Sequence, residues 1–167
     1  MVMISEYLET ELTREIAAPI AELACRCFAS KTTVADRINR MLLAAGSQDP
    51  EKTSGRRFVI WQDGCAVAHA RVFVRLVKFE STTIPVLALA TVCSAPEVRG
   101  MGLGVKVTTK ALELVGRDDW PQVSLFQTGV PEFYRKLNSR PITNRFVNRL
   151  DIADPEANPW HDEKVMI

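Results

Sequence analysis

The residues that point most directly to chemistry occupy positions 92–106, where an apolar run ends, a glycine-rich turn follows and an amphipathic helix begins. Gly100, Gly102 and Gly104 carry no Cβ atoms, so several backbone N–H groups can approach one ligand at a helix N-terminus. Unpaired donors and the positive end of the helix dipole together favour an anion. Arg99 adds a guanidinium suited to phosphate. The turn therefore predicts a phosphate-binding site.

Two familiar phosphate-binding patterns do not fit this turn. A dinucleotide-binding Rossmann turn has the spacing Gly-x-Gly-x-x-Gly, but Val105 stands where its last glycine belongs, and no run of βαβ units surrounds it. A P-loop needs Gly-Lys-Ser/Thr, which this turn lacks. The simpler alternative, a tight strand-to-helix turn without a ligand, stays open.

Length and composition indicate one ordinary globular domain spanning residues 1–167. The chain is 47% hydrophobic and 25% charged, which is typical of such domains. Its 21 basic and 20 acidic residues leave a net charge of +1, so no global field attracts nucleic acid or a membrane surface. We therefore expect neither as a partner.

The four cysteines have neither zinc-site nor CxxC spacing, so we expect no metal and interpret all four as buried, reduced, apolar residues. The first residues lack the basic and apolar regions of a secretory signal. The longest apolar run, residues 84–93, is too short to span a bilayer and contains Pro85. These features predict a cytoplasmic protein.

Hydrophobic periodicity in the first two thirds predicts a strand, two helices and three further strands. Thr13 and Thr33 are candidate helix N-caps, Gly46 ends the second helix, and residues 46–55 form a loop. Asp63-Gly64 is a strong hairpin turn. The expected strands are residues 4–12, 57–62, 65–79 and 84–93.

The remaining third predicts a helix from Leu103 to Gly116, a strand at 122–127, a short helix at 132–137 after Pro131, and one or two strands within 145–167. The element order is therefore β-α-α-β-β-β-α-β-α-β. Such an order is typical of an α+β domain with a mixed sheet.

With its elements placed, the chain resembles the GNAT (Gcn5-related) N-acetyltransferase superfamily. The family signature, Arg/Gln-x-x-Gly-x-Gly/Ala between the fourth strand and the next helix, is met by Arg99, Gly102 and Gly104. Residues 132–137, Glu-Phe-Tyr-Arg-Lys-Leu, are similar to the family's Phe-Tyr-x-Lys-Leu helix. Asn138 stands where the family usually has glycine, but Asn tolerates the left-handed conformation of a helix end.

The resemblance implies a fold and a co-substrate. The central sheet would be mixed, mostly antiparallel and splayed between its fourth and fifth strands, with helices on both faces. Acetyl-CoA would place its pyrophosphate on the turn and its pantetheine arm on the backbone of the fourth strand. The implied cofactor-binding residues are Val92, Cys93, Ser94, Arg99, Gly100, Met101, Gly102, Leu103 and Gly104.

The implied activity is acetyl-CoA-dependent N-acetylation of a primary amine in a small molecule or peptide, by direct attack on the thioester. The amide near Val92 would polarise the thioester carbonyl, and Tyr134 matches the family's frequent general acid. Other interpretations stay open: Tyr134 as a packing residue without a catalytic role, and the chain as a non-catalytic acyl-CoA-binding or interaction module. An acyl donor other than acetyl, with Leu89 and Phe126 shaping the acyl pocket, and a homodimer also stay open.

The general base is not identified by the sequence. Many relatives carry a glutamate on the fourth strand, whereas residues 86–90 here contain no carboxylate. Cys93 lies near the expected thioester, but no histidine is close in sequence, which favours a structural role over a covalent one. The candidate bases are Glu80, His69, Glu132, His161 and Asp162.

Overall fold

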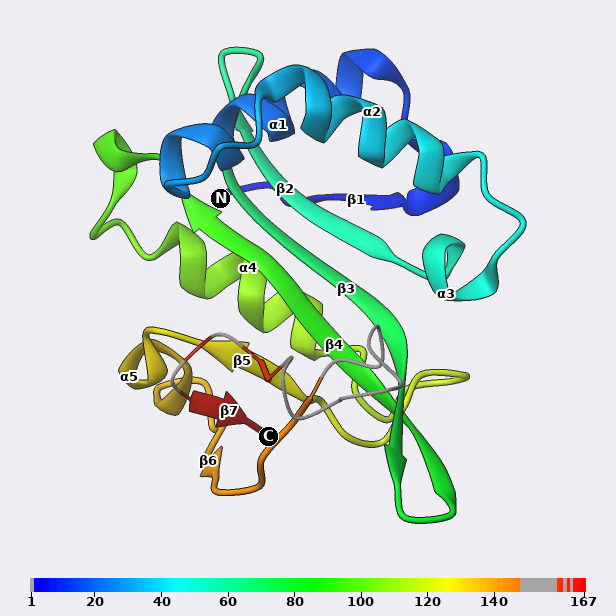
Figure 1. The fold of residues 1–167 in the computed structure, drawn as a ribbon. Coiled ribbons are helices and arrows are strands. Elements are labelled where there is room, and N and C mark those ends of the chain that lie inside the picture. The colour runs from blue at the N-terminus through cyan, green and yellow to red at the C-terminus, as the bar shows by residue number, and fades with distance from the viewer. Residues whose placement is uncertain (1, 148–158, 161, 163) are drawn as a thin grey trace.

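A four-stranded antiparallel sheet in the order β1-β2-β3-β4 is the frame of the molecule (Figure 1). The computed structural model describes residues 2–147, 159–160, 162 and 164–167. Alternating apolar residues form the long strands, and Asp63-Gly64 closes the β2–β3 hairpin with both residues at positive φ. The strands are β1 (Ser5–Leu8), β2 (Arg56–Gln62), β3 (Cys65–Phe79) and β4 (Thr82–Ser94).

Helices cover both faces of this sheet (Figure 1). Helices α1 (Arg14–Cys27) and α2 (Val34–Ala45) pack on one face, and α4 (Leu103–Leu112) packs on the other. Thr33 begins α2 with a capping box, because its side chain and that of Asp36 each accept the other's backbone N–H. This arrangement confirms the predicted α+β class with a mostly antiparallel sheet.

Strands β4 and β5 (Phe126–Thr128) are connected at one point only among the described residues. The Leu87 N–H donates to the Val123 carbonyl and the Leu125 N–H donates to the Leu87 carbonyl, each at 2.9 Å, in a parallel bridge. Beyond it β5 joins a second sheet in the order β5-β7-β6, with β6 at Pro141–Ile142 and β7 at Lys164–Met166. The predicted splay between the fourth and fifth strands is therefore confirmed.

Several predicted boundaries were wrong, and each difference has a local cause. Residues 46–55 contain a short helix, α3 (Pro50–Thr53), which proline begins favourably. The first strand is short, because a 3-10 turn, η1 (Glu9–Glu11), follows it. The fifth strand was expected from residue 122 but begins at Phe126, because the residues before it pair with β4 only at Leu87. No helix among the described residues is long and apolar enough to cross a membrane.

The region near the C-terminus contains α5 (Pro131–Arg135), with Pro131 in its first turn as expected. Asn138, in the turn that follows this helix, adopts φ 64°, the left-handed conformation that its place in the motif predicts. Two short strands follow, although part of the predicted strand region, residues 148–158, lies outside the described residues. The turn after α5 therefore contains the left-handed conformation that glycine would favour.

A charged cluster lies buried where β1, β2 and β3 meet. The fully buried Glu9 carboxylate accepts from Arg57 Nη2 at 2.6 Å and from Arg71 Nε at 3.2 Å. Arg57 Nη1 lies 3.4 Å from His69 Nε2, and His69 Nδ1 lies 2.8 Å from the Thr91 carbonyl oxygen. Because that carbonyl can only accept, His69 Nδ1 carries the proton and Nε2 accepts from Arg57. The cluster thus connects η1, directly after the first strand, to β4.

Replacing Glu9 with alanine is expected to lower the free energy of unfolding by about 3–5 kcal/mol, because two guanidinium groups lose their shared carboxylate inside the protein. Urea denaturation followed by circular dichroism measures the change. Glu6→Ala is the matched control, since Glu6 pairs with Arg56 on the partly exposed sheet edge and its loss should cost about 0–1 kcal/mol. Equal losses in the two variants would contradict the prediction.

Candidate functional site

The glycine turn forms the N-terminus of α4, directly after β4. Gly100 and Gly102 have φ values of 83° and 74°, a left-handed conformation that glycine adopts without a Cβ penalty. The space next to both Cα atoms is open, with no heavy atom within 4 Å of a Cβ built at either position. The sequence therefore folds these residues into an exposed turn whose open side faces away from the protein.

Two of the turn's backbone amides are occupied and the others are not. The N–H groups of Arg99 and Met101 donate to the carbonyls of Pro96 and Val98, each at 3.3 Å. Within the described residues, the amides of Gly100, Gly102, Leu103 and Gly104 donate to no protein acceptor. These are the orphan donors of a helix N-terminus, and an anion is the ligand that they favour.

Gly104 has a different function from the other two glycines. A Cβ atom at this position would lie 2.9 Å from Ser94 Oγ and 3.8 Å from the Phe133 ring. The missing side chain thus allows the first turn of α4 to approach the end of β4 and α5 closely. This contact places the exposed turn beside the last residues of β4.

Strand β4 contains a β-bulge at the level of the splay. The register with β3 shifts between His69 and Arg71, so that Thr91 and Val92 stand opposite Ala70. Thr91 has φ 48°, an uncommon value for a β-branched residue, and its carbonyl is held by buried His69. Burial and the charge of Arg57 lower the pKa of His69 to about 3, so the ring is neutral at neutral pH. His69 is therefore a structural support of the bulge.

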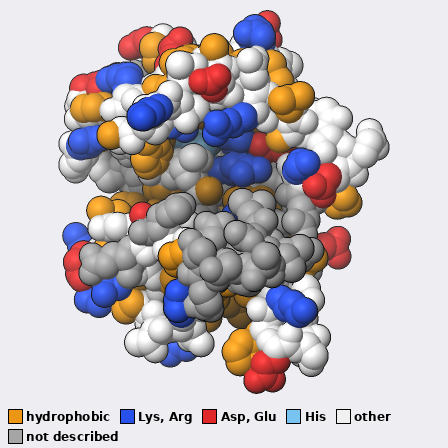
Figure 2. Space-filling model, in the orientation of Figure 1, with side chains coloured by type: hydrophobic (Ala, Val, Ile, Leu, Met, Phe, Trp, Pro, Cys, Tyr) orange, Lys and Arg blue, Asp and Glu red, His pale blue; other side chains and the backbone are white. Residues whose placement is uncertain are grey.

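A cavity of about 450 Å³ lies in the gap between β4 and β5. Phe28 at the end of α1 closes one side. Figure 2 shows that the face with α1 and α2 is hollowed across the middle of the molecule, with lysine and arginine side chains gathered in the hollow. Central lining residues are Ala88, Ala90, Thr91, Val92, Phe126 and Tyr134.

Tyr134 lies in the cavity wall, packed between two phenylalanine rings. Its ring centroid is 4.7 Å from that of Phe126 and 4.9 Å from that of Phe133. Burial and the negative charge of Asp162 raise the pKa of Tyr134 to about 12, although a hydrogen bond from Thr128 opposes the shift. The phenol is therefore protonated at neutral pH and can donate into the cavity.

The candidate bases are widely scattered. Asp162 lines the cavity, whereas Glu80 lies in the exposed β3–β4 turn and Glu132 pairs with Arg135 on the surface. His69 is buried, and its ring nitrogens face Arg57 and a carbonyl. His161 lies outside the described residues. Of the described candidates, the structure places only Asp162 with Tyr134.

The expectation that all four cysteines are buried was wrong. Cys93 is buried, Cys25 and Cys27 are partly exposed, and Cys65 is exposed in the strand after the β2–β3 turn. Cys25 and Cys27 point to different partners, since Cys25 Sγ lies 3.6 Å from the Thr32 carbonyl oxygen. The two-residue spacing along α1 predicts that the two side chains diverge, but it does not predict the contacts of Cys27.

Cys27 brings the end of α1 to the end of β4 and to the glycine turn. Its Sγ lies 3.3 Å from the Ser94 carbonyl oxygen and contacts the Cys93 thiol and the Arg99 guanidinium. A hydrogen bond from Cys93 and the hydrogen bond and charge of Arg99 lower the pKa of Cys27, while the contact with Cys27 and burial raise that of Cys93. Cys93 is therefore a protonated thiol, which disfavours it as a nucleophile.

Sequence reasoning missed two groups of residues in this region. Cys27 carried no signal, because its partners lie 66 or more positions away. Arg71 and Arg75 did carry one, because with Phe73 they occupy alternate positions of β3 and so share one face of a mostly apolar strand. Arg75 and Phe73 line the cavity together with Ala88 of the neighbouring strand.

Comparison with known proteins places this arrangement in a family. The model of the "Acetyltransferase (GNAT) domain" matches residues 10–141. The chain therefore belongs to the GNAT acetyltransferases. No curated protein matches it.

Solved structures with the same fold share little sequence with this chain. Escherichia coli ElaA is 17% identical, with a TM-score of 0.61 over 99% of this chain and 97% of that one. An acyl-CoA N-acyltransferase from Pseudomonas aeruginosa is 17% identical, with a TM-score of 0.61 over 99% and 98%. Glucosamine-6-phosphate N-acetyltransferase from Arabidopsis thaliana is 16% identical, with a TM-score of 0.59 over 89% and 99%. These likenesses show the fold.

Alkylation of Cys27 by iodoacetamide is expected to reach half its maximal rate at a pH below that of an unperturbed thiol, about 8.5. The thiolate is the reacting species, and Cys93 and Arg99 lower its pKa. Peptide mass spectrometry across a pH series measures the midpoint, with exposed Cys65 as the reference in the same sample. Arg99→Gln should move the Cys27 midpoint upward. A midpoint at or above 8.5 would contradict the prediction.

Proposed function

We propose that this protein is an acetyl-CoA-dependent N-acetyltransferase that acts on a primary amine by direct attack. The observation that carries the proposal is the set of unpaired turn amides at the N-terminus of α4, lying beside a cavity in the β4–β5 splay. A diphosphate bound to these amides would be positioned for its attached arm to follow β4 into the cavity. Membership of the GNAT family supports the same co-substrate.

The binding residues follow from this placement. The amides of Gly100, Gly102, Leu103 and Gly104 hold the pyrophosphate, with the exposed Met101 side chain and the Arg99 guanidinium at the rim. The arm lies along the backbone of Val92, Cys93 and Ser94 as an added strand would. The bulge beside Thr91 turns the strand toward the cavity, so the Val92 amide is the candidate donor to the thioester oxygen.

The reaction forms one bond and breaks one. The neutral amine nitrogen attacks the thioester carbonyl carbon, the C–N bond forms, and collapse of the tetrahedral intermediate breaks the C–S bond. The nitrogen loses one proton and the sulfur gains one. Asp162 is the carboxylate at the cavity wall, and we assign it to attracting the substrate ammonium and accepting its proton.

Tyr134 is the proposed donor to the leaving sulfur. Its pKa of about 12 keeps the proton on the phenol until charge develops on sulfur. Burial also raises the pKa of a thiol in the cavity. The difference in pKa between the Tyr134 phenol and the leaving thiol is therefore smaller than in water. Tyr134 therefore acts at the stage when the C–S bond breaks.

A second candidate function, a non-catalytic acyl-CoA-binding module, is favoured by one observation. Strand β4 presents Ala88, Leu89 and Ala90 to the cavity and no carboxylate. Incubation with acetyl-CoA and a panel of primary amines, with release of free thiol as the readout, separates the two functions. Binding of CoA without turnover of any amine would favour the module, whereas no binding at millimolar CoA would overturn both.

Gly102→Ala is expected to raise the dissociation constant of CoA about tenfold or more, because the methyl group enters the open side of the turn and strains its left-handed backbone. Isothermal titration calorimetry measures the change. Gly64→Ala is a matched control, since Gly64 has a similar φ of 77° and equally open surroundings in the β2–β3 turn. An equal effect of both substitutions would remove the turn from the binding site.

Tyr134→Phe is expected to lower kcat by about 10²–10⁴-fold with little change in CoA affinity, because it removes the proton donor and keeps the ring packed between its neighbours. Steady-state thiol release and calorimetry give the two quantities. Tyr7→Phe is the control, because Tyr7 packs against Trp61 and does not line the cavity. An unchanged kcat in Tyr134→Phe would remove the acid role.

A further inference from the structure

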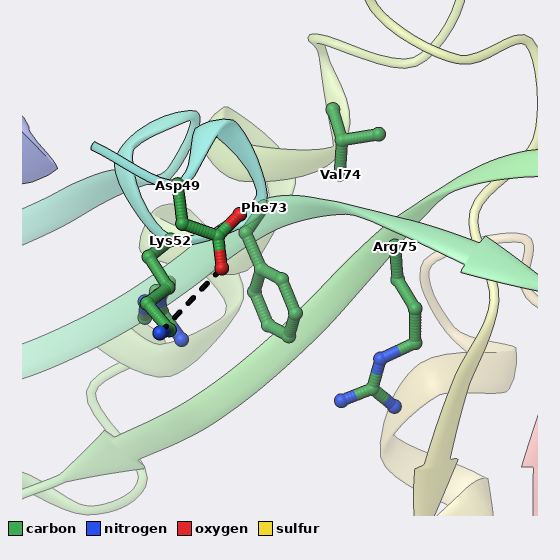
Figure 3. A pocket seen from close by; sticks show the side chains of 6 residues that line it. Asp49, Lys52, Phe73, Val74 and Arg75 are labelled. Carbon is green, nitrogen blue, oxygen red and sulfur yellow. Dashed lines mark ion pairs between the residues drawn. The ribbon is translucent and has the colours of Figure 1, made fainter. Parts of the chain in front are cut away.

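A second cavity, of about 330 Å³, adjoins the one in the splay. The two share Phe73 and Arg75 in their walls, so they are neighbours. Figure 3 shows Phe73 and Arg75 on one side of β3, with Val74 pointing the opposite way. Asp49 and Lys52 reach the same space from the α3 segment. A region rich in cationic side chains thus lies next to the cavity that Tyr134 lines.

The charges around the second cavity do not balance. Asp49 and Lys52 pair with each other at 3.5 Å. Buried Glu9 carries one negative charge but binds both Arg57 and Arg71. Burial lowers the pKa of Arg57, yet a guanidinium keeps its proton in proteins. One positive charge of this cluster is therefore uncompensated.

Arg71 presents that charge to the cavity. Its Nε is bound to Glu9, and its guanidinium lies over the Phe73 ring at 4.4 Å from the centroid. Among the described residues, no acceptor contacts its Nη atoms, and the side chain is 20% exposed. The Nη donors thus remain for a ligand in the cavity that Arg71 lines.

Arg75 also contacts the aromatic ring of Phe73. Its guanidinium is 5.2 Å from the Phe73 centroid and 5.5 Å from the Trp160 centroid. Arg71 lies two residues before Phe73 and Arg75 lies two residues after it, so the three side chains project from one face of β3. Ring contacts limit the directions in which the two planar guanidinium groups can turn, which favours a ligand of fixed geometry.

We propose that the acceptor amine carries an anionic group, a carboxylate or a phosphate, which Arg71 and Arg75 bind in the second cavity while the amine reaches Tyr134. This inference rests on the proposed acetyltransferase function. Guanidinium groups match both anions through paired, charge-assisted hydrogen bonds. The anion also balances the extra positive charge of the cluster formed by Glu9, Arg57 and Arg71.

The test compares amines that differ only in the anion. β-Alanine is paired with β-alaninamide, and phosphoethanolamine with ethanolamine, in the thiol-release assay. At least one anionic member should have a kcat/KM about tenfold or more above its neutral partner. The pair that shows the preference tells carboxylate from phosphate. Equal values within both pairs would overturn the inference and leave the acetyltransferase function intact.

Two variants locate the effect. Arg71→Met keeps an unbranched apolar stem and leaves Glu9 paired with Arg57, and Arg75→Gln removes the second charge. Each should raise KM for the anionic amine about tenfold, with kcat and the KM of the neutral amine little changed. Arg117→Gln, at an exposed arginine beyond α4, should change neither. Equal rises in KM for both members of a pair would overturn the inference.

A binding measurement keeps the inference testable if no amine is acetylated. With CoA present to occupy the turn, inorganic phosphate or acetate at constant ionic strength should raise Tm of the wild-type protein by about 2–4 °C. The rise should be absent in Arg71→Met and Arg75→Gln. The same rise in the variants, or none in the wild type, would overturn the anion site. Absence of thiol release from every amine would overturn only the acetyltransferase function.

Discussion

The separation of β4 from β5 after Leu87 is the constraint on which the site depends. A strand inside a sheet uses its backbone N–H and C=O groups on both sides, but β4 has a sheet partner on one side only beyond this residue. The same divergence opens a cavity of about 450 Å³. The splay therefore leaves backbone groups of β4 without a strand partner beside this cavity.

The bulge in β4 explains how the divergence is held. An extra residue bends a strand and increases its local twist. Thr91 accepts a positive φ that costs of order 1–3 kcal/mol, which must be offset by the surrounding structure. His69 supplies that support through the Thr91 carbonyl and is itself fixed by Arg57 and Glu9. The shape of β4 therefore depends on a charged cluster that begins at Glu9, in the turn after the first strand.

Local signals in the sequence were sufficient for much of the fold. The bounds of β3 matched the prediction, and Thr33, Gly46 and the Asp63-Gly64 turn lie where their side-chain chemistry predicts, because each acts on residues next to it in the chain. The glycine turn was likewise visible, since φ values and the absence of Cβ atoms are properties of single residues.

The parts that the sequence did not reveal depend on contacts between distant segments. Cys27 meets Ser94 across 67 positions, and Glu9 meets Arg71 across 62. Neither pair has a periodic pattern that would connect its members. Helix α3 is only one turn long, too short for hydrophobic periodicity to distinguish it from a loop. The charge of the second cavity is thus a property of the fold and not of any one segment.

The two cavities carry opposite charges at their ends, and this arrangement bears on how an acceptor would enter. Asp162 lies in the wall with Tyr134, while Arg71 and Arg75 line the region beyond Phe73. A molecule with an ammonium at one end and an anion at the other has one favourable orientation in that field, with its nitrogen toward Tyr134. Deprotonation of the ammonium then weakens its attraction to Asp162 while the anion stays bound. In the proposed reaction, the field that selects the orientation would therefore also hold the acceptor during attack.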